Sequence, residues 1–283
     1  MSHPSPPLEL FPPPPGFRSP ITTVHRQGTY DFYGPVSPRL AGSAAAFVLE
    51  HCVAAAAAAA ADDDDDDGLA RALSSFLDDA AAHARKQHAG PAAGQRGTHS
   101  AWLCVRATPP TDAWVTPRWH RDGRMFDCTC GAPPSSCCSP RPHAKYAVTL
   151  LGPPTRMLRP SEAVDAAVRE AETEARRRGG AGSDKDDDDN DGGGSDYYCA
   201  AEEEERAALA AALEGMPLVE LRAGQVVRFA WGGADAPVHS EPDSSAEARV
   251  FASVLFGSEA ELRDMCGLRG EVYGEEKTWV PPL

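Results

Sequence analysis

His120 and Asp122 are a pair of side chains that could bind one metal ion. They flank Arg121 and follow the segment Trp114–Trp119. If this segment is extended, residues two apart lie on one face, so the imidazole and the carboxylate can point toward the same ion. His239, much further along the chain, offers a third ligand. Two histidines and one carboxylate on one face form the facial triad of non-haem Fe(II) enzymes, which leaves positions on the ion open.

Arg249 begins the segment Arg249–Phe256, which is the clearest strand pattern in the sequence. On such a strand Ser253 shares the face of Arg249. A guanidinium can bind a carboxylate through two parallel hydrogen bonds. Together with the triad, this predicts that Arg249 binds the distal carboxylate of 2-oxoglutarate and that Ser253 or Tyr146 adds a hydroxyl hydrogen bond.

Simpler interpretations remain open for each of these residues. A chance H-x-D motif is expected in a chain with 9 histidines, so the prediction depends on the whole ordered set and not on the motif alone. The simpler roles are a surface pair for His120 and Asp122, a loop histidine held by Glu241 for His239, a surface ion pair for Arg249, and a core position for Tyr146.

The order and context of these residues resemble the Fe(II)/2-oxoglutarate-dependent oxygenase superfamily, whose core is a double-stranded β-helix, or jelly roll. The resemblance covers residues 100–257 apart from two inserted segments. It implies that His120, Asp122 and His239 are the catalytic iron ligands. It also implies that Arg249 anchors 2-oxoglutarate, so that Fe(II) and 2-oxoglutarate are the expected cofactors.

A looser similarity links the chain to an uncharacterised bacterial family. That family has an H-x-D motif, a Gly-Pro-Gly-Thr stretch and a Val-His-Arg-Ser-Pro stretch. The matching segments here are Trp119–Asp122, Gly152–Thr155 and Val238–Pro242. This second similarity implies no activity.

Short strands joined by turns are expected from residue 99 onward, which is typical of a sandwich or jelly roll. The expected strands are Ala101–Ala107, Lys145–Leu151, Pro217–Glu220, Gln225–Trp231, Pro237–Ser240 and Arg249–Phe256. The turn signal Arg222–Gly224 predicts a hairpin between Pro217–Glu220 and Gln225–Trp231. The expected fold class is α+β, with a jelly-roll domain over 99–283 that carries insertions at 127–143 and 161–215.

Helical patterns precede and interrupt this β region. Ser43–Ala61 is rich in alanine, and Gly68–His88 has leucine and phenylalanine at spacings of three and four. Ser161 is a plausible N-cap for one inserted helix, and Glu202–Leu213 forms another. Residues 1–20 are expected to be a disordered proline-rich tail, residues 21–98 a helical region with an acidic linker, and residues 179–195 a disordered segment.

The formal net charge of -15 comes mainly from three acidic runs, Asp62–Asp67, Asp186–Asp189 and Glu202–Glu205. Such runs repel one another and stay solvated. Because no basic stripe is present, nucleic acid is not a favoured partner. No stretch approaches the roughly 20 apolar residues of a membrane span, so no membrane partner is expected.

The cysteines do not form the pattern of a disulfide framework. Cys128, Cys130, Cys137 and Cys138 crowd one stretch and could form a zinc knuckle with His143. However, their irregular spacing favours a thiol-rich insertion. Reduced thiols and the absence of a signal-peptide pattern predict an intracellular protein, either cytoplasmic or nuclear.

The sequence is consistent with three hypotheses for the function of the protein. The first is an Fe(II)- and 2-oxoglutarate-dependent oxygenase, of hydroxylase or demethylase type, that acts on an unknown small-molecule or protein substrate. The second is a non-catalytic jelly-roll scaffold or interaction protein. The third is a cupin-type metalloenzyme without 2-oxoglutarate, in which Arg249 would point away from the metal. The oligomeric state is open.

Overall fold

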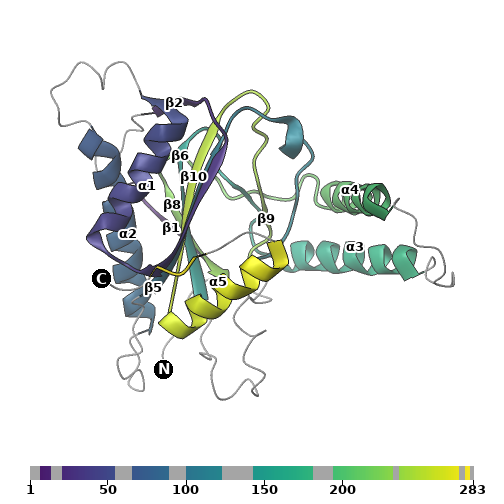
Figure 1. The fold of residues 1–283 in the computed structure, drawn as a ribbon. Helices are drawn as coiled ribbons and strands as arrows, with labels where there is room; N and C mark the ends of the chain where they lie inside the picture. The colour runs from purple at the N-terminus through teal and green to yellow at the C-terminus, as the bar shows by residue number, and fades with distance from the viewer. Residues whose placement is uncertain are drawn as a thin grey trace.

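The computed structural model describes residues 7–13, 21–54, 66–88, 100–122, 143–180, 194–231, 236–273 and 278–280. Within these residues the chain forms a mixed α+β fold around a large antiparallel sheet. Two helices cover one face of the sheet, while a second layer of short strand pairs covers part of the other face (Figure 1).

Six strands make up the large sheet, in the order β1-β8-β6-β10-β5-β3, and all neighbours are antiparallel. The strands are β1 (Leu8–Phe11), β3 (Gly28–Pro35), β5 (Ser100–Thr108), β6 (His143–Leu151), β8 (Val226–Trp231) and β10 (Arg249–Gly257). β10 lies at the centre between β5 and β6.

Alternation along β10 separates the two faces of the sheet. Val250, Val254 and Phe256 belong to the main hydrophobic core on the helical side. Phe251 and Ser253 line a cavity on the opposite side. Since the side-chain period of a strand is two residues, this register places Arg249 on the cavity side as well.

Helices α1 (Pro38–His51) and α2 (Asp66–His88) supply the helical layer. Proline at the first position of α1 suits a helix start, because its missing N–H would have had no intrahelical partner. Buried residues recur on each helix at spacings of three and four, which gives each an apolar stripe toward the sheet. These are Leu40, Ala41, Ala44, Ala45 and Val48 on α1, and Leu69, Leu73, Phe76, Leu77, Ala80, Ala81 and Ala84 on α2.

The second layer consists of short paired segments. β7 (Arg156–Met157) pairs with β9 (His239–Ser240), and isolated bridges join His120 to His239 and Leu158 to Leu218. Met157 is fully buried and packs with Phe229 of β8. The second layer therefore rests on the large sheet.

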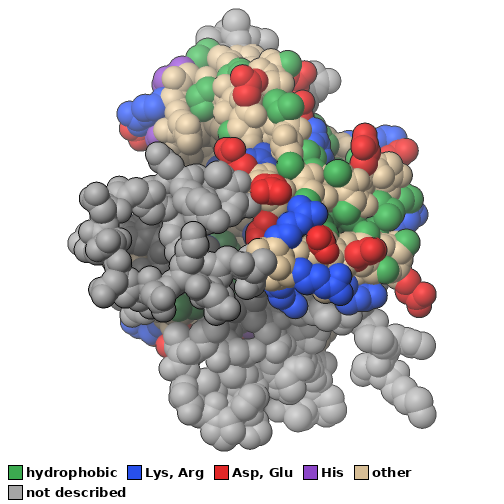
Figure 2. All heavy atoms as spheres, turned by 90° about the vertical axis from the view of Figure 1, so that its right-hand side faces the viewer, with side chains coloured by type: hydrophobic (Ala, Val, Ile, Leu, Met, Phe, Trp, Pro, Cys, Tyr) green, Lys and Arg blue, Asp and Glu red, His purple; other side chains and the backbone are tan. Residues whose placement is uncertain are grey.

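Two further helices, α3 (Glu162–Gly180) and α4 (Gly194–Ala212), project from the body as an arm (Figure 1). Ser161 caps α3, because its Oγ accepts a hydrogen bond from the Val164 amide at 3.3 Å. The base of the arm packs on a separate apolar cluster that includes Trp119 and Leu158. Figure 2 looks onto this end of the molecule and shows acidic and basic side chains intermixed there.

The remaining elements are small or lie at one edge. α5 (Glu259–Tyr273) packs against β3 and β5 through Leu262 and Met265. β2 (Ile21–Val24) pairs with β4 (Cys52–Ala54), and η1 (Asp112–Trp114) is a single 3-10 turn. No helix among the described residues is long and apolar enough to cross a membrane.

Most of the expected elements are confirmed. The structure has the helices expected at Gly68–His88, after Ser161 and at Glu202–Leu213, and the strands expected near residues 101–107, 145–151, 225–231 and 249–256. The helix expected over Ser43–Ala61 instead begins at Pro38 and ends at His51, because the chain then pairs with β2 as β4.

Three sequence expectations are corrected. The expected hairpin partner of β8 is wrong, since β8 pairs with β1 and β6, while residues 217–219 run beside residues 157–159. The expectation of a disordered tail is wrong for Leu8–Phe11, which forms an antiparallel pair with β8. Residues 21–98 are not only helical, because they also supply β3, an edge strand of the sheet. The rest of the tail and the segment 181–193 lie outside the described residues.

Candidate metal centre

The two histidines of the expected triad are brought together by direct backbone pairing. The amide of His120 donates to the carbonyl of His239 at 2.9 Å, and the amide of His239 donates to the carbonyl of His120 at 2.9 Å. Residues directly opposite in an antiparallel pair carry their side chains on the same face. The imidazole centroids consequently lie 4.4 Å apart.

Backbone carbonyls fix the tautomer of both imidazoles. His120 Nδ1 lies 2.8 Å from the carbonyl oxygen of Arg118, and His239 Nδ1 lies 3.1 Å from that of Pro237. Because a carbonyl can only accept, each Nδ1 must carry the proton. In the neutral ring, Nε2 then carries the lone pair that a metal ligand requires.

Asp122 completes the group with one carboxylate oxygen. Its Oδ1 lies 3.8 Å from His120 Nε2 and 3.7 Å from His239 Nε2. One ligand atom from each of the three residues lies within 4.8 Å of the others. The other oxygen, Oδ2, accepts a hydrogen bond from Lys145 Nζ at 3.0 Å. Lys145 thus holds the carboxylate so that one oxygen faces the histidines.

The surroundings set the charge of these ligands. Burial of His239 lowers the pKa of its imidazole to about 4, which Asp122 only partly offsets, so the ring is neutral at neutral pH. Burial alone would raise the pKa of Asp122, but the positive charge and hydrogen bond of Lys145 hold it well below its usual range. His239 and Asp122 therefore offer a neutral nitrogen and an anionic oxygen.

Arg249 is buried and lines the same cavity as the triad. Its Nε donates to the carbonyl of Pro153 at 3.1 Å, and its Nη2 donates to Thr155 Oγ1 at 2.8 Å. These bonds use two of the five guanidinium donors. Burial lowers the pKa of Arg249 to about 10, so the group keeps its charge at neutral pH. The surface ion pair considered from the sequence does not fit this placement.

The turn that holds Arg249 depends on Gly152. Its φ of 77° lies in the left-handed region, and an added Cβ would come within 2.0 Å of the Ala248 carbonyl oxygen. Glycine at this position lets the chain turn back after β6, which places Pro153 and Thr155 against Arg249.

Ser253 and Tyr146 lie on opposite faces of the sheet. Ser253 lines the cavity, as expected for a residue that shares the face of Arg249. Tyr146 belongs to the core on the helical side, and its hydroxyl lies 2.9 Å from His83 Nδ1 of α2. The expected hydrogen bond from Tyr146 to 2-oxoglutarate is thus corrected, because alternation along β6 turns this side chain away from the cavity.

The alternative role of His239 as a loop histidine bound to Glu241 does not fit the structure, because the carboxylate of Glu241 faces two arginines. This carboxylate accepts a hydrogen bond from Arg118 at 2.7 Å and lies 4.0 Å from Arg106. Burial would raise the pKa of Glu241, but Arg118 lowers it below the usual range. This group forms one wall of the cavity.

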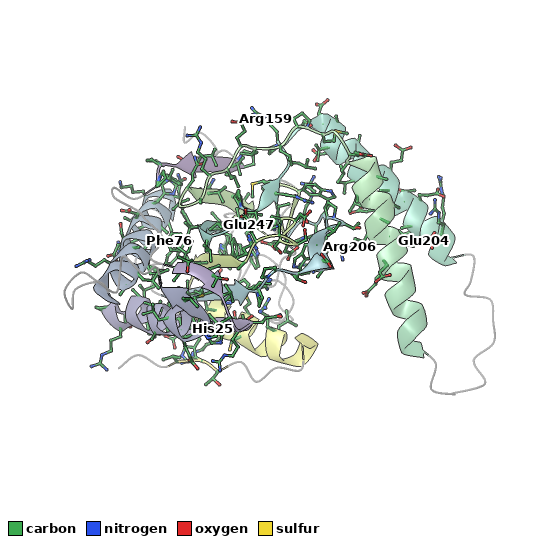
Figure 3. All side chains as sticks on the ribbon, turned by 90° about the horizontal axis from the view of Figure 1, so that it is seen from above. His25, Phe76, Arg159, Glu204, Arg206 and Glu247 are labelled. Carbon is green, nitrogen blue, oxygen red and sulfur yellow. The ribbon has the colours of Figure 1, made fainter. Side chains whose placement is uncertain are left out.

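Two arginines attach the arm to the His120–Asp122 motif and to the segment before it. Arg121, between the two motif ligands, donates to Asp165 of α3 and to the carbonyl of Ala236, close to His239. Arg206 of α4 donates to the carbonyls of Ala113 and Thr116, and Figure 3 shows it between the arm and the body. The base of the arm thus contacts the motif itself and the segment that precedes it.

Lys145, Thr155 and Arg121 are site residues to which the sequence reading gave no role. Lys145 could have been found, because a charged residue that alternates with Ala147 in an apolar strand must face a polar partner. The bonds of Thr155 and Arg121 depend on the folded loops and leave no spacing signal. The cysteine cluster at residues 128–138 lies outside the described residues, and His143 packs on Trp231 and Glu261.

Comparisons with protein-family models, with curated proteins and with solved structures find no match to this chain. The geometry of the centre therefore carries the functional argument: the His-Asp-His group could hold a metal ion.

Proposed function

We propose that this protein is an Fe(II)- and 2-oxoglutarate-dependent oxygenase with a jelly-roll core. The observation that carries the proposal is the convergence of His120, Asp122 and His239 in a cavity that Arg249 also lines. The cupin-type alternative predicts that Arg249 points away from the metal. Its placement in the same cavity favours the oxygenase.

The strand pairing supports a jelly roll. Along the chain, the second-layer segment at His120 lies between β5 and β6, the segments at β7 and Leu218 both lie between β6 and β8, and β9 lies between β8 and β10. In the sheet these strands have the order β8-β6-β10-β5. In the second layer residue 120 pairs with 239, 239 with 157, and 158 with 218. Eight segments divided between two layers in this way fit a jelly roll.

The donor set fits a non-haem iron ion. Two imidazole nitrogens and one carboxylate oxygen are the ligands of a facial triad, which leaves three positions on an octahedral ion. Iron with a chelated 2-oxo acid supplies the oxidising chemistry when it is bound.

The residues of the chain have separate tasks in this proposal. His120 and His239 would bind the metal through Nε2, since each Nδ1 donates to a backbone carbonyl, and Asp122 supplies the negative charge. The guanidinium of Arg249 binds the distal carboxylate of 2-oxoglutarate. Phe229 and Phe251 line the cavity beside these groups and reduce the access of water.

The test is metal-dependent turnover of 2-oxoglutarate without added substrate. The full chain is incubated with Fe(II), ascorbate and 2-oxoglutarate in air, and succinate is measured by NMR. Slow succinate formation is expected. It should disappear in H239A, should require a higher 2-oxoglutarate concentration in R249M, and should persist in R263M, which alters an exposed arginine on α5.

Two other outcomes would move the assignment to an alternative. If the protein binds metal but neither binds nor consumes 2-oxoglutarate, the cupin-type enzyme is favoured. If no divalent metal binds to the triad, the catalytic proposal fails and a non-catalytic interaction protein remains.

A further inference from the structure

The cavity has a second cationic end, formed on the indole of Trp102. The guanidinium carbon of Arg269, from α5, lies 4.5 Å from the centroid of the Trp102 ring, and Lys145 Nζ lies 5.4 Å from it. The indole is fixed by a hydrogen bond from its Nε1 to Asp31 Oδ1 at 2.9 Å. All three cavity residues, Trp102, Lys145 and Arg269, line the space that contains the triad.

This end of the cavity lies away from Arg249. Trp102 is directly opposite Leu255 of β10, which is six residues beyond Arg249. At about 3.3 Å per residue, the two positions are separated by roughly 20 Å along the strand. Arg249 and Arg269 therefore belong to different ends of the cavity, and 2-oxoglutarate anchored at Arg249 would occupy the end away from Trp102.

The cavity is positively charged although the chain as a whole has a net charge of -15. Among the described residues, six cationic and two acidic side chains line it, and adding the nearby Asp31 and Asp165 leaves more positive than negative charges in this described set. The cationic residues are Arg106, Arg118, Arg121, Lys145, Arg249 and Arg269, and the acidic residues are Asp122 and Glu241. A divalent metal and a dianionic 2-oxoglutarate cancel one another, so the excess persists in the loaded site.

We propose that the Arg269 end binds an anionic group, a carboxylate or a phosphate, of the substrate. A cavity with clustered positive charge attracts anions and raises their local concentration, and a guanidinium forms strong charge-assisted hydrogen bonds with both groups. The cavity volume of about 450 Å³ suits a small molecule. The substrate class is therefore a small organic acid or phosphate ester, and its identification as the substrate rests on the proposed oxygenase function.

The test uses three aromatic probes that differ in charge: phenyl phosphate, benzoate and benzylamine. Each is titrated calorimetrically into the full chain loaded with Mn(II) and 2-oxoglutarate. At least one of the two anions should bind, and which of them binds more tightly identifies phosphate or carboxylate as the preferred group. The benzylammonium cation should not bind.

A matched pair of variants locates the site. R269M should weaken binding of the anion about tenfold or more, because a charge-assisted hydrogen bond is lost. R269K should have an intermediate effect. R263M is the control, since Arg263 lies on the same helix and stacks on Trp279 at 4.4 Å in the same manner, but does not line the cavity.

Several results would overturn this proposal. They are equal anion affinity in R269M, R269K and the wild type, displacement of the anion by 2-oxoglutarate one for one, equal binding of benzylamine, or no anion binding at all. If the protein does not bind metal or 2-oxoglutarate, the oxygenase proposal fails separately. The comparison of R269M with R263M in the metal-free protein then still decides whether the anion site exists.

Discussion

At the scale of single residues, Lys145 sets which oxygen of Asp122 would face a metal ion in the proposed centre. Lys145 Nζ bonds to one carboxylate oxygen and leaves the other facing both imidazoles. The ammonium has two opposing effects on a bound cation, because it repels the positive charge while it orients the ligand. We infer that orientation dominates, since the distance of 3.0 Å from Lys145 to Asp122 fixes a carboxylate that would otherwise rotate.

Replacement of Lys145 by methionine should therefore weaken metal binding. The variant keeps the length of the side chain and removes the hydrogen bond to Asp122. Loss of such an outer partner commonly costs about 10- to 100-fold in metal affinity. Mn(II) binding followed by electron paramagnetic resonance would measure the effect. Unchanged or tighter binding would mean that the positive charge of Lys145 opposes the metal more than its hydrogen bond orients the ligand.

The buried imidazole of His239 predicts acid sensitivity of the metal-free protein. Burial lowers its pKa from 6.5 to about 4, so between these values the unfolded chain binds a proton that the folded chain does not. Stability is then full above pH 6.5 and falls as the pH drops toward 4, by on the order of 3 kcal/mol. Urea unfolding in the presence of a chelator should give a shallower pH dependence for H239Q. The same slope in both proteins would show that another group is responsible.

At the scale of elements, the sequence predicts the position of a strand or helix better than it predicts which elements pair with one another. The heptad-like spacing of α2 and the alternation of β10 were readable because each follows from one local period. The pairing of residues 217–219 with residues 157–159 cannot be predicted from the sequence, because a turn signal does not specify which strand a neighbouring segment pairs with. The predicted role of Tyr146 in the cavity is wrong for a related reason. The sequence does not give the register of β6, so it does not tell which face of the sheet carries Tyr146.

The candidate centre shows the same division. The residue types and order of the triad were visible in the sequence, and the structure brings His120, Asp122 and His239 together. The residues that orient these ligands are not visible in the sequence. Arg121, for example, bonds to α3 and to the chain before β9, which are both far from it in the sequence. Contacts between distant segments arise only from the fold.

The attachment of the arm predicts that its base supports the metal centre. R121M removes the hydrogen bonds from the H-x-D motif to Asp165 and Ala236. D165N weakens only the bond between Arg121 and residue 165. Both variants should lower Mn(II) affinity, R121M more than D165N. The matched control is R178M, which removes an exposed contact with Glu174 further along α3. Equal affinities in all three variants would show that the arm does not position the ligands.

At the scale of the whole molecule, the large sheet separates two environments. The helical side is an apolar core that includes Leu73 and Val254, both fully buried. The other side carries a charged cavity between the sheet and the short second layer, beside smaller apolar clusters that include Met265 and Met157. This division lets stability reside mainly on one face of the sheet, while the polar site occupies the other.

The most direct test of the central claim is an anaerobic titration of the full chain with Fe(II) and then 2-oxoglutarate, followed by visible absorption. A 2-oxo acid chelated to iron in a two-histidine, one-carboxylate site gives a weak visible charge-transfer band. The account predicts that this band forms in the wild type, is absent in H239A, and requires more 2-oxoglutarate in R249M. Iron binding without the band, or a band that is unchanged in H239A, would contradict it.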